Sequence, residues 1–187
     1  TVNATSDGAI TLDTTTSFSG LTALTTETSG SAQTLTAAAT TDITATASAQ
    51  GATAVSIDGG KDVSVTATGG NTNDADVTIG GTTAAAGSVT VNYTGATLAD
   101  GAELTAQTNG DITVTGGTTI SVTSNGAVSG GSDKETDALT LGSVTVTGDA
   151  STTEVSVTKT AAQDRVAGDD GNAAIVNGEV TITDANA

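Results

Sequence analysis

Apolar and hydroxyl residues alternate along most of this chain in a short recurring pattern. One acidic or hydroxyl residue is followed by an apolar, a hydroxyl and another apolar residue, as in Asp62-Val63-Ser64-Val65. Alternation with a period of two places branched apolar side chains on one side of an extended strand and hydroxyl groups on the other. The pattern therefore predicts half-buried β-strands at eight places, which begin at Asp42, Asp62, Asp76, Ser88, Asp111, Ser143, Glu154 and Glu179.

Shorter apolar runs predict further strands, and glycine and asparagine mark the turns between strands. We expect these additional strands at residues 10–12, 21–24, 55–57, 120–122 and 139–141. Pairs such as Gly59-Gly60 and Asn109-Gly110 separate the strands, and both residue types accept a positive φ. No apolar stripe keeps a helical period over a useful length, so we expect almost no helix.

The spacing of the pattern favours an all-β parallel β-solenoid. Successive copies begin 11 to 32 residues apart, which is more irregular than a simple hairpin meander. A coil of parallel strands joined by irregular Gly, Asn and Asp loops tolerates such variation. With about 20 residues per turn, the chain would form roughly nine turns. The alternative is an antiparallel β-sandwich, but a sandwich of immunoglobulin type contains a buried Trp, and this chain has none.

The chain as a whole is expected to be one unit of a larger protein. The strand pattern runs from end to end without a shift in composition, so residues 1–187 are interpreted as a single β-solenoid segment. Because the sequence starts at Thr1 with no initiator Met and no visible secretion signal, we expect this segment to be a fragment of a longer chain.

Composition excludes many kinds of chemistry. The chain has no Cys and no His, so zinc, haem and iron–sulfur sites and Ser–His or Cys–His catalytic pairs are excluded. It carries 21 acidic and 4 basic residues, a net charge of −17, which argues against nucleic-acid binding. No apolar run is long enough to insert into a membrane. We do not expect an enzyme. Paired carboxylates could serve a glycosidase, but such sites lie in grooves lined with aromatic side chains, and this chain has only one Phe and one Tyr.

Few aromatic and basic residues are present, and each has a simple expected role. The two aromatic residues, Phe18 and Tyr93, are expected to fill the core or cap the fold. The four basic residues are expected to pair with acidic residues close to them, and they are Lys61, Lys134, Lys159 and Arg165.

Calcium is the one cofactor that these side chains favour. It is a hard cation that binds carboxylate, amide and backbone oxygens, and glycine-rich turns can direct several such oxygens to one centre. The densest acidic group consists of Asp164, Asp169, Asp170 and Asn172. Two further candidate groups lie at Asp58 and Asp62 and at Asn73, Asp74 and Asp76. Solvated acidic loops are the competing interpretation of all three groups. Bound calcium would also offset the self-repulsion of a highly acidic chain.

Several segments resemble a known family in the same order along the chain. They include the residues from Ile10 to Thr25, Ser31-Ala-Gln-Thr-Leu-Thr-Ala, Ser151-Thr-Thr-Glu-Val-Ser-Val and Gly178-Glu-Val-Thr-Ile-Thr-Asp. Together they resemble the lattice-forming part of the Caulobacter-type S-layer protein, a calcium-dependent relative of the RTX proteins. The resemblance implies type I secretion and calcium-driven assembly of identical copies into a two-dimensional lattice. It implies an extracellular location on the bacterial surface, with anchoring by a part of the protein outside this sequence.

One departure from the RTX pattern bears on the calcium expectation. The nearest match to the calcium-binding nonapeptide begins at Gly168, where Asp169 replaces the second glycine and Ala173 replaces the ligand aspartate. Calcium is therefore not assigned from that motif. The alternative function is a stalk or spacer of a secreted RTX-type adhesin or other extracellular fibre, in which the same strands would act as a rigid spacer.

Overall fold

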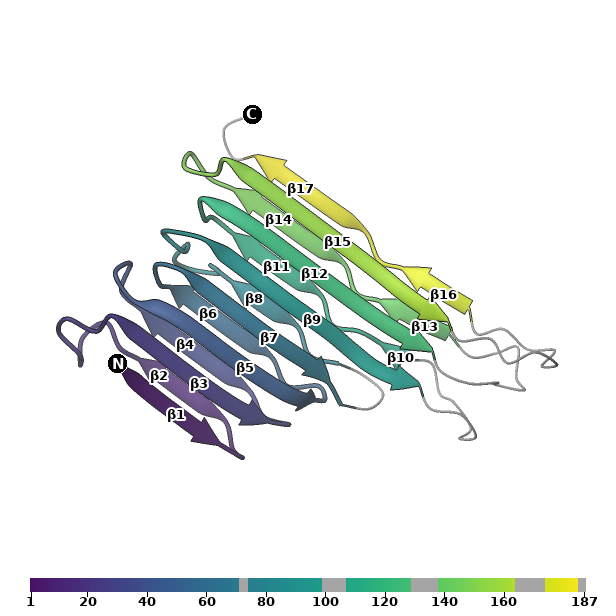
Figure 1. Ribbon diagram of the computed structural model, residues 1–187, viewed down its shortest axis with the longest axis horizontal. Coiled ribbons are helices and arrows are strands. Elements are labelled where there is room, and N and C mark those ends of the chain that lie inside the picture. Colours follow the sequence, from purple (N-terminus) through teal and green to yellow (C-terminus); the bar gives the residue numbers. More distant parts are fainter. Residues whose placement is uncertain (71–73, 99–106, 129–137, 164–173, 185–187) are drawn as a thin grey trace.

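The computed structural model describes residues 1–70, 74–98, 107–128, 138–163 and 174–184, and these residues form strands and no helix (Figure 1). The strands form two sheets of seven and one sheet of three. Sheet A contains, in spatial order, β1 (Val2–Ser6), β3 (Ala23–Ser29), β5 (Asp42–Gln50), β7 (Val63–Gly69), β9 (Val89–Leu98), β12 (Thr119–Val128) and β15 (Glu154–Gln163).

The second large sheet lies opposite the first, and the small sheet lies beside the later strands (Figure 1). Sheet B contains β2 (Ile10–Asp13), β4 (Gln33–Ala37), β6 (Val55–Gly59), β8 (Val77–Ile79), β11 (Ile112–Thr115), β14 (Val144–Gly148) and β17 (Val180–Asp184). Sheet C contains β10 (Gln107–Thr108), β13 (Ala138–Leu141) and β16 (Ala174–Asn177).

Every strand pair within these described ranges is parallel. The alternative expectation of an antiparallel sandwich is therefore wrong. The chain passes from sheet A to sheet B and back, and from β9 onward it also contributes a strand to sheet C. Successive strands of each sheet thus follow the order of the sequence. We use "rung" for one strand of sheet A with the strand of sheet B that follows it.

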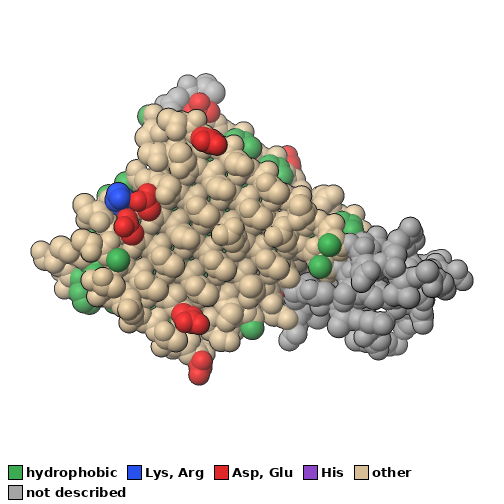
Figure 2. Space-filling view, in the orientation of Figure 1, with side chains coloured by type: hydrophobic (Ala, Val, Ile, Leu, Met, Phe, Trp, Pro, Cys, Tyr) green, Lys and Arg blue, Asp and Glu red, His purple; other side chains and the backbone are tan. Residues whose placement is uncertain are grey.

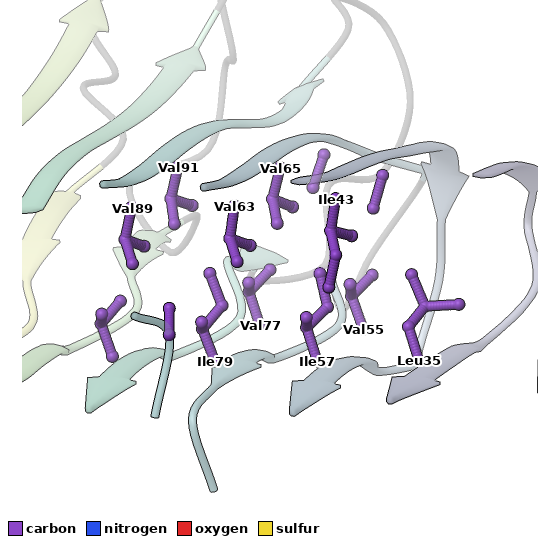
Figure 3. Packing of buried hydrophobic residues seen from close by; sticks show 14 of the residues in the cluster. Leu35, Ile43, Val55, Ile57, Val63, Val65, Val77, Ile79, Val89 and Val91 are labelled. Carbon is purple, nitrogen blue, oxygen red and sulfur yellow. The ribbon is translucent and has the colours of Figure 1, made fainter. Parts of the chain in front are cut away.

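The core lies between the two large sheets and consists of ladders of branched side chains (Figure 3). In sheet A, register places Ile43, Val63 and Val89 directly above one another. In sheet B, Ile57 and Ile79 form a matching ladder that faces them. Because each rung repeats the same inward positions, like side chains stack on like, which buries a continuous apolar column.

The strand predictions are largely confirmed. All eight copies of the alternating pattern lie in strands, and so do four of the five shorter runs. The fifth run, at residues 21–24, is strand only from Ala23 onward. Each large sheet has seven strands rather than the roughly nine turns expected. Later rungs contain more residues. Val2 pairs with Leu24, which is 22 residues later in the sequence, whereas Ile120 pairs with Val155, which is 35 residues later.

Tyr93 and Phe18 occupy opposite environments. Tyr93 is 1% exposed on β9, and its hydroxyl oxygen accepts a hydrogen bond of 3.0 Å from the backbone N–H of Gly110. Sheet C begins with β10, the strand that follows β9. The large ring therefore fills the interior at the rung where the third sheet is added. Tyr93 is thus the core filler expected. Phe18 is 45% exposed, so it does not fill the core, and the capping role expected for it stays a prediction.

Candidate functional site

The expected acidic sites divide into residues inside and outside the described structure. Asp164, Asp169, Asp170, Asn172 and Asn73 lie outside the described residues, and the calcium role expected for them stays a prediction. The remaining candidates, Asp58, Asp62, Asp74 and Asp76, lie within it on or beside strands of the two large sheets.

Asp58 joins its own rung to the loop of the next. It lies on β6, and its Oδ1 atom accepts the backbone N–H groups of Thr82 and Thr83 at 2.6 and 3.2 Å. Those residues follow β8, the neighbour of β6 in sheet B. Two backbone donors that would otherwise need water are thereby paired with a charged acceptor.

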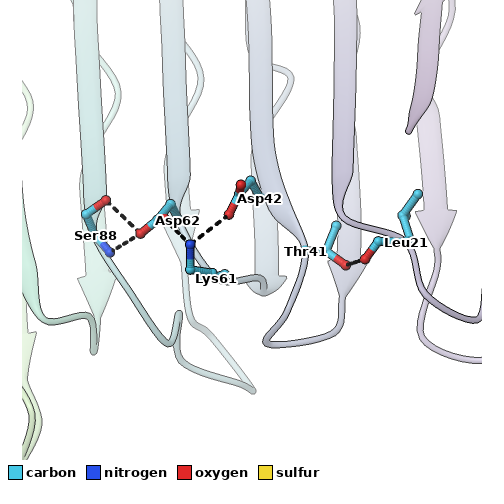
Figure 4. A network of polar contacts seen from close by, with 6 residues as sticks. All are labelled: Leu21, Thr41, Asp42, Lys61, Asp62 and Ser88. Carbon is cyan, nitrogen blue, oxygen red and sulfur yellow. Dashed lines mark hydrogen bonds and ion pairs between the residues drawn. The ribbon is translucent and has the colours of Figure 1, made fainter.

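Asp62 lies in a small polar network at the start of β7 (Figure 4). Its Oδ1 atom accepts the backbone N–H of Ser88 at 2.8 Å and the Ser88 hydroxyl at 2.9 Å. The Lys61 ammonium lies 3.0 Å from the other carboxylate oxygen and 3.7 Å from Asp42. The hydrogen bond from the Ser88 backbone, followed by that from Lys61, lowers the pKa of Asp62 to about 2. Lys61 therefore pairs with neighbouring acids, as expected.

Acid is expected to weaken the fold partly through Asp62. Its pKa is about 2 in the folded chain and near 3.8 without these partners, so its contribution is present above pH 3.8 and is lost as the pH falls towards 2. Urea unfolding at pH 5 and pH 2.5 should show a smaller loss of stability for Asp62→Asn than for the unmodified chain. The difference should stay below about 1 kcal/mol, because exposed charges are screened. Equal losses would show that Asp62 does not contribute.

Asp76 and Asp111 repeat the arrangement seen at Asp58. Asp76 accepts the backbone N–H of Asp111 at 2.9 Å, and Asp111 in turn accepts that of Ser143 at 2.6 Å. These residues immediately precede β8, β11 and β14, which are neighbours in sheet B. The carboxylates thus form a column in which each rung binds the backbone of the next.

Asp74 differs from the other three because it is buried, with 8% of its surface exposed. Its Oδ1 atom accepts the backbone N–H of Gly70 at 3.2 Å, and Gly70 directly follows β7. Asp74 also raises the pKa of the nearby Tyr93 hydroxyl, although burial is the main cause of that shift. Asp74 is thus part of the packed interior beside Tyr93.

The calcium role expected for these described carboxylates also stays a prediction. Among the residues that the structure describes, no group of three or more acidic side chains is placed to hold a metal ion. Asp58 and Asp62 flank the same Gly59-Gly60 turn, yet each accepts hydrogen bonds from a different loop. The observed hydrogen bonds of Asp58, Asp62 and Asp76 join one rung to the next.

Lys159 has a role that the sequence analysis missed. Its ammonium donates to the carbonyl oxygens of Gly142 at 2.6 Å and Gly178 at 2.8 Å, and it forms no ion pair with an acid among the described residues. Burial lowers the pKa of this group. Alternation along β15 places Lys159 on the same side as Val155 and Val157, and this inward position was the available signal. Lys134 and Arg165 themselves lie outside the described residues, and the pairing expected for them stays a prediction.

Comparison with known proteins provides no family assignment. No protein-family model matches the chain, and no curated protein matches it significantly. Within the described ranges, no helix is long and apolar enough to span a membrane.

Proposed function

We propose that this chain is a structural, self-assembling segment of a calcium-dependent bacterial surface layer (S-layer). The observation that carries the proposal is the stack of parallel rungs, in which branched side chains form ladders from one rung to the next. A body built in this way is stiff and repetitive, and most of its strand surface is free for contact. The described acidic residues serve this stack rather than a reaction centre, so we propose no enzymatic activity.

The finer architecture proposed for the chain is a parallel β-solenoid. It is supported by the regular passage of the chain between sheets A and B and by the parallel pairing of successive rungs. A parallel pair needs a crossover connection, and here the crossover is supplied by the strand of the opposite sheet. One complete turn of the chain then contains one strand from each of sheets A and B, and from β9 onward it also contains one strand of sheet C.

Calcium and location remain proposals that rest on the resemblance. A net charge of −17 opposes contact between copies, and divalent cations would offset that repulsion. The acidic group at Asp164, Asp169, Asp170 and Asn172 is the strongest remaining candidate for such ions. We further propose type I secretion and an extracellular location on the bacterial surface, with identical copies as partners and anchoring by another part of the protein.

Calcium titration tests this function directly. Adding calcium should increase light scattering and produce ordered two-dimensional arrays in electron micrographs, and a chelator should reverse both effects. Magnesium at the same concentration is the control for general screening of charge, because it binds protein oxygens with stricter geometry and keeps more of its water. Scattering that does not respond to calcium would contradict the proposed layer.

The alternative function, a stalk or spacer of an RTX-type adhesin, is favoured by one feature of the fold. Each strand pairs only with the strands of the preceding and following rungs, so the stack extends in one direction. A stalk would remain an elongated monomer at millimolar calcium, and small-angle scattering separates that outcome from a growing array.

A further inference from the structure

The outer side of sheet A carries a regular grid of uncharged polar side chains. In the four central strands β5, β7, β9 and β12, register aligns a first column of Thr44, Ser64, Thr90 and Ser121. It aligns a second column of Thr46, Thr66, Asn92 and Thr123. All eight side chains are exposed or half-buried, since the inward positions between them form the core. We call these two columns the hydroxyl face.

This face carries no charge in a chain whose net charge is −17. The charged side chains of sheet A lie around it, with Glu27 on β3, Asp42 at the start of β5 and Glu154 at the start of β15. Figure 2 shows the result, since charged atoms lie towards the margins and the middle of this side is uncharged and without a hollow. Two acidic copies repel each other least where such neutral surfaces meet.

The outer side of sheet B is less suited to close contact. Its strands are only three to five residues long, against seven to ten for the central strands of sheet A. Two of its outward positions are aspartates, Asp13 and Asp58. Asp58 lies on an inner strand of that sheet, whereas the acidic residues of sheet A lie outside the hydroxyl face.

The size and repeat of sheet A fit a second copy of the same chain. With strands about 4.8 Å apart and about 3.3 Å per residue, its outer side covers roughly 600–900 Å². A stable interface buries about 800 Å² on each partner, which is the same order. A second copy has the same spacing between strands and between residues along each strand. Its two columns of polar side chains therefore match the gaps between the columns of the first copy. Threonine methyl groups would then exclude water, while hydroxyl groups donate and accept hydrogen bonds.

We propose that the hydroxyl face packs against the hydroxyl face of a second copy around a twofold axis. This inference rests on the proposed function, because it names the surface through which two copies of the layer protein meet. An isologous contact of this kind uses one surface patch twice and leaves the other sides of both copies free for further contacts.

Matched threonine variants test the proposal by sedimentation velocity over a range of protein concentrations. Thr66→Glu places a carboxylate in the centre of the hydroxyl face, and Thr34→Glu places the same group on an exposed strand position of sheet B. The unmodified chain should form dimers. Thr66→Glu should raise the dissociation constant of the dimer at least about tenfold through like-charge repulsion, and Thr34→Glu should leave it unchanged. Circular dichroism confirms that both variants are folded.

The possible failures are distinguishable. If the chain assembles but the two variants behave alike, the hydroxyl face is not the contact, while the proposed self-assembly stands. If the unmodified chain stays monomeric with and without calcium, both proposals fail. A monomer whose binding to a purified cell-surface polysaccharide is lost in Thr66→Glu would assign the face to a glycan and overturn the twofold contact.

Discussion

Replacing Tyr93 with alanine is expected to lower the free energy of unfolding by about 3–5 kcal/mol, the usual cost of removing a buried aromatic ring. The ring is 1% exposed, and it is among the largest side chains of the core. Its neighbours along the sheet are small, since Ala67 precedes it and Ser124 follows it in register. Neither of these two side chains is large enough to fill the space left by the ring. Chemical denaturation monitored by circular dichroism measures the loss.

Two further variants separate the contributions of Tyr93. Tyr93→Phe keeps the ring but leaves the backbone N–H of Gly110 without its acceptor, so it should cost about 1–3 kcal/mol. Phe18→Ala removes the other aromatic ring, which is 45% exposed, and should change stability by less than about 0.5 kcal/mol. If Tyr93→Ala were as mild as Phe18→Ala, the ring would not be supporting the junction at which the third sheet begins.

The strands could be predicted because their cause is local. A period of two needs only four neighbouring residues, and the copy at Asp62-Val63-Ser64-Val65 becomes the start of β7 with alternating burial. Parallel pairing was also accessible, since irregular spacing disfavours hairpins. The length of each rung was not predictable, because loop residues and two strands of sheet C, β10 and β16, carry no comparable periodic signal.

Strand β4, whose first inward residue is polar, escaped prediction. In β4 the first inward position is Gln33, which is fully buried and breaks the apolar pattern. Its side chain accepts the Thr26 hydroxyl at 2.6 Å and donates to the Thr46 carbonyl at 2.6 Å. Both partners belong to sheet A, so they become visible only when the two sheets face each other. A buried amide is stable only with such partners.

The acidic residues show the same limit at the candidate site. Local sequence offered calcium as the chemistry of Asp58, Asp62 and Asp76, and it gave no sign of the hydrogen bonds that these residues accept. The donors that they meet are backbone N–H groups 24 to 35 residues away. Such partners are fixed by the stacking of rungs, which no motif within one loop can show.

Three glycines at the corners between sheets C and B leave little room for a side chain, and they are Gly110, Gly142 and Gly178. Gly142 follows β13, and a Cβ atom added to it would lie 2.1 Å from the carbonyl oxygen of Gly110 in the preceding rung. The obstructing atom belongs to the backbone, so no side chain can rotate to relieve the contact. The next glycine of this column, Gly178, has the same relation to Gly142, at 2.7 Å from its carbonyl oxygen. Only glycine allows three successive rungs to approach so closely here.

Gly142→Ala should therefore lower the free energy of unfolding by about 3 kcal/mol, the upper range for an overpacked interior. It should also disturb Lys159, because the Lys159 ammonium donates to the Gly142 carbonyl oxygen. Gly51→Ala is the matched control, since nothing lies within 4 Å of a Cβ atom at Gly51. Urea denaturation of both variants measures the difference. Equal stability would mean that the rungs can separate locally at little cost, and the close stacking at Gly110, Gly142 and Gly178 would then not determine the spacing of the fold.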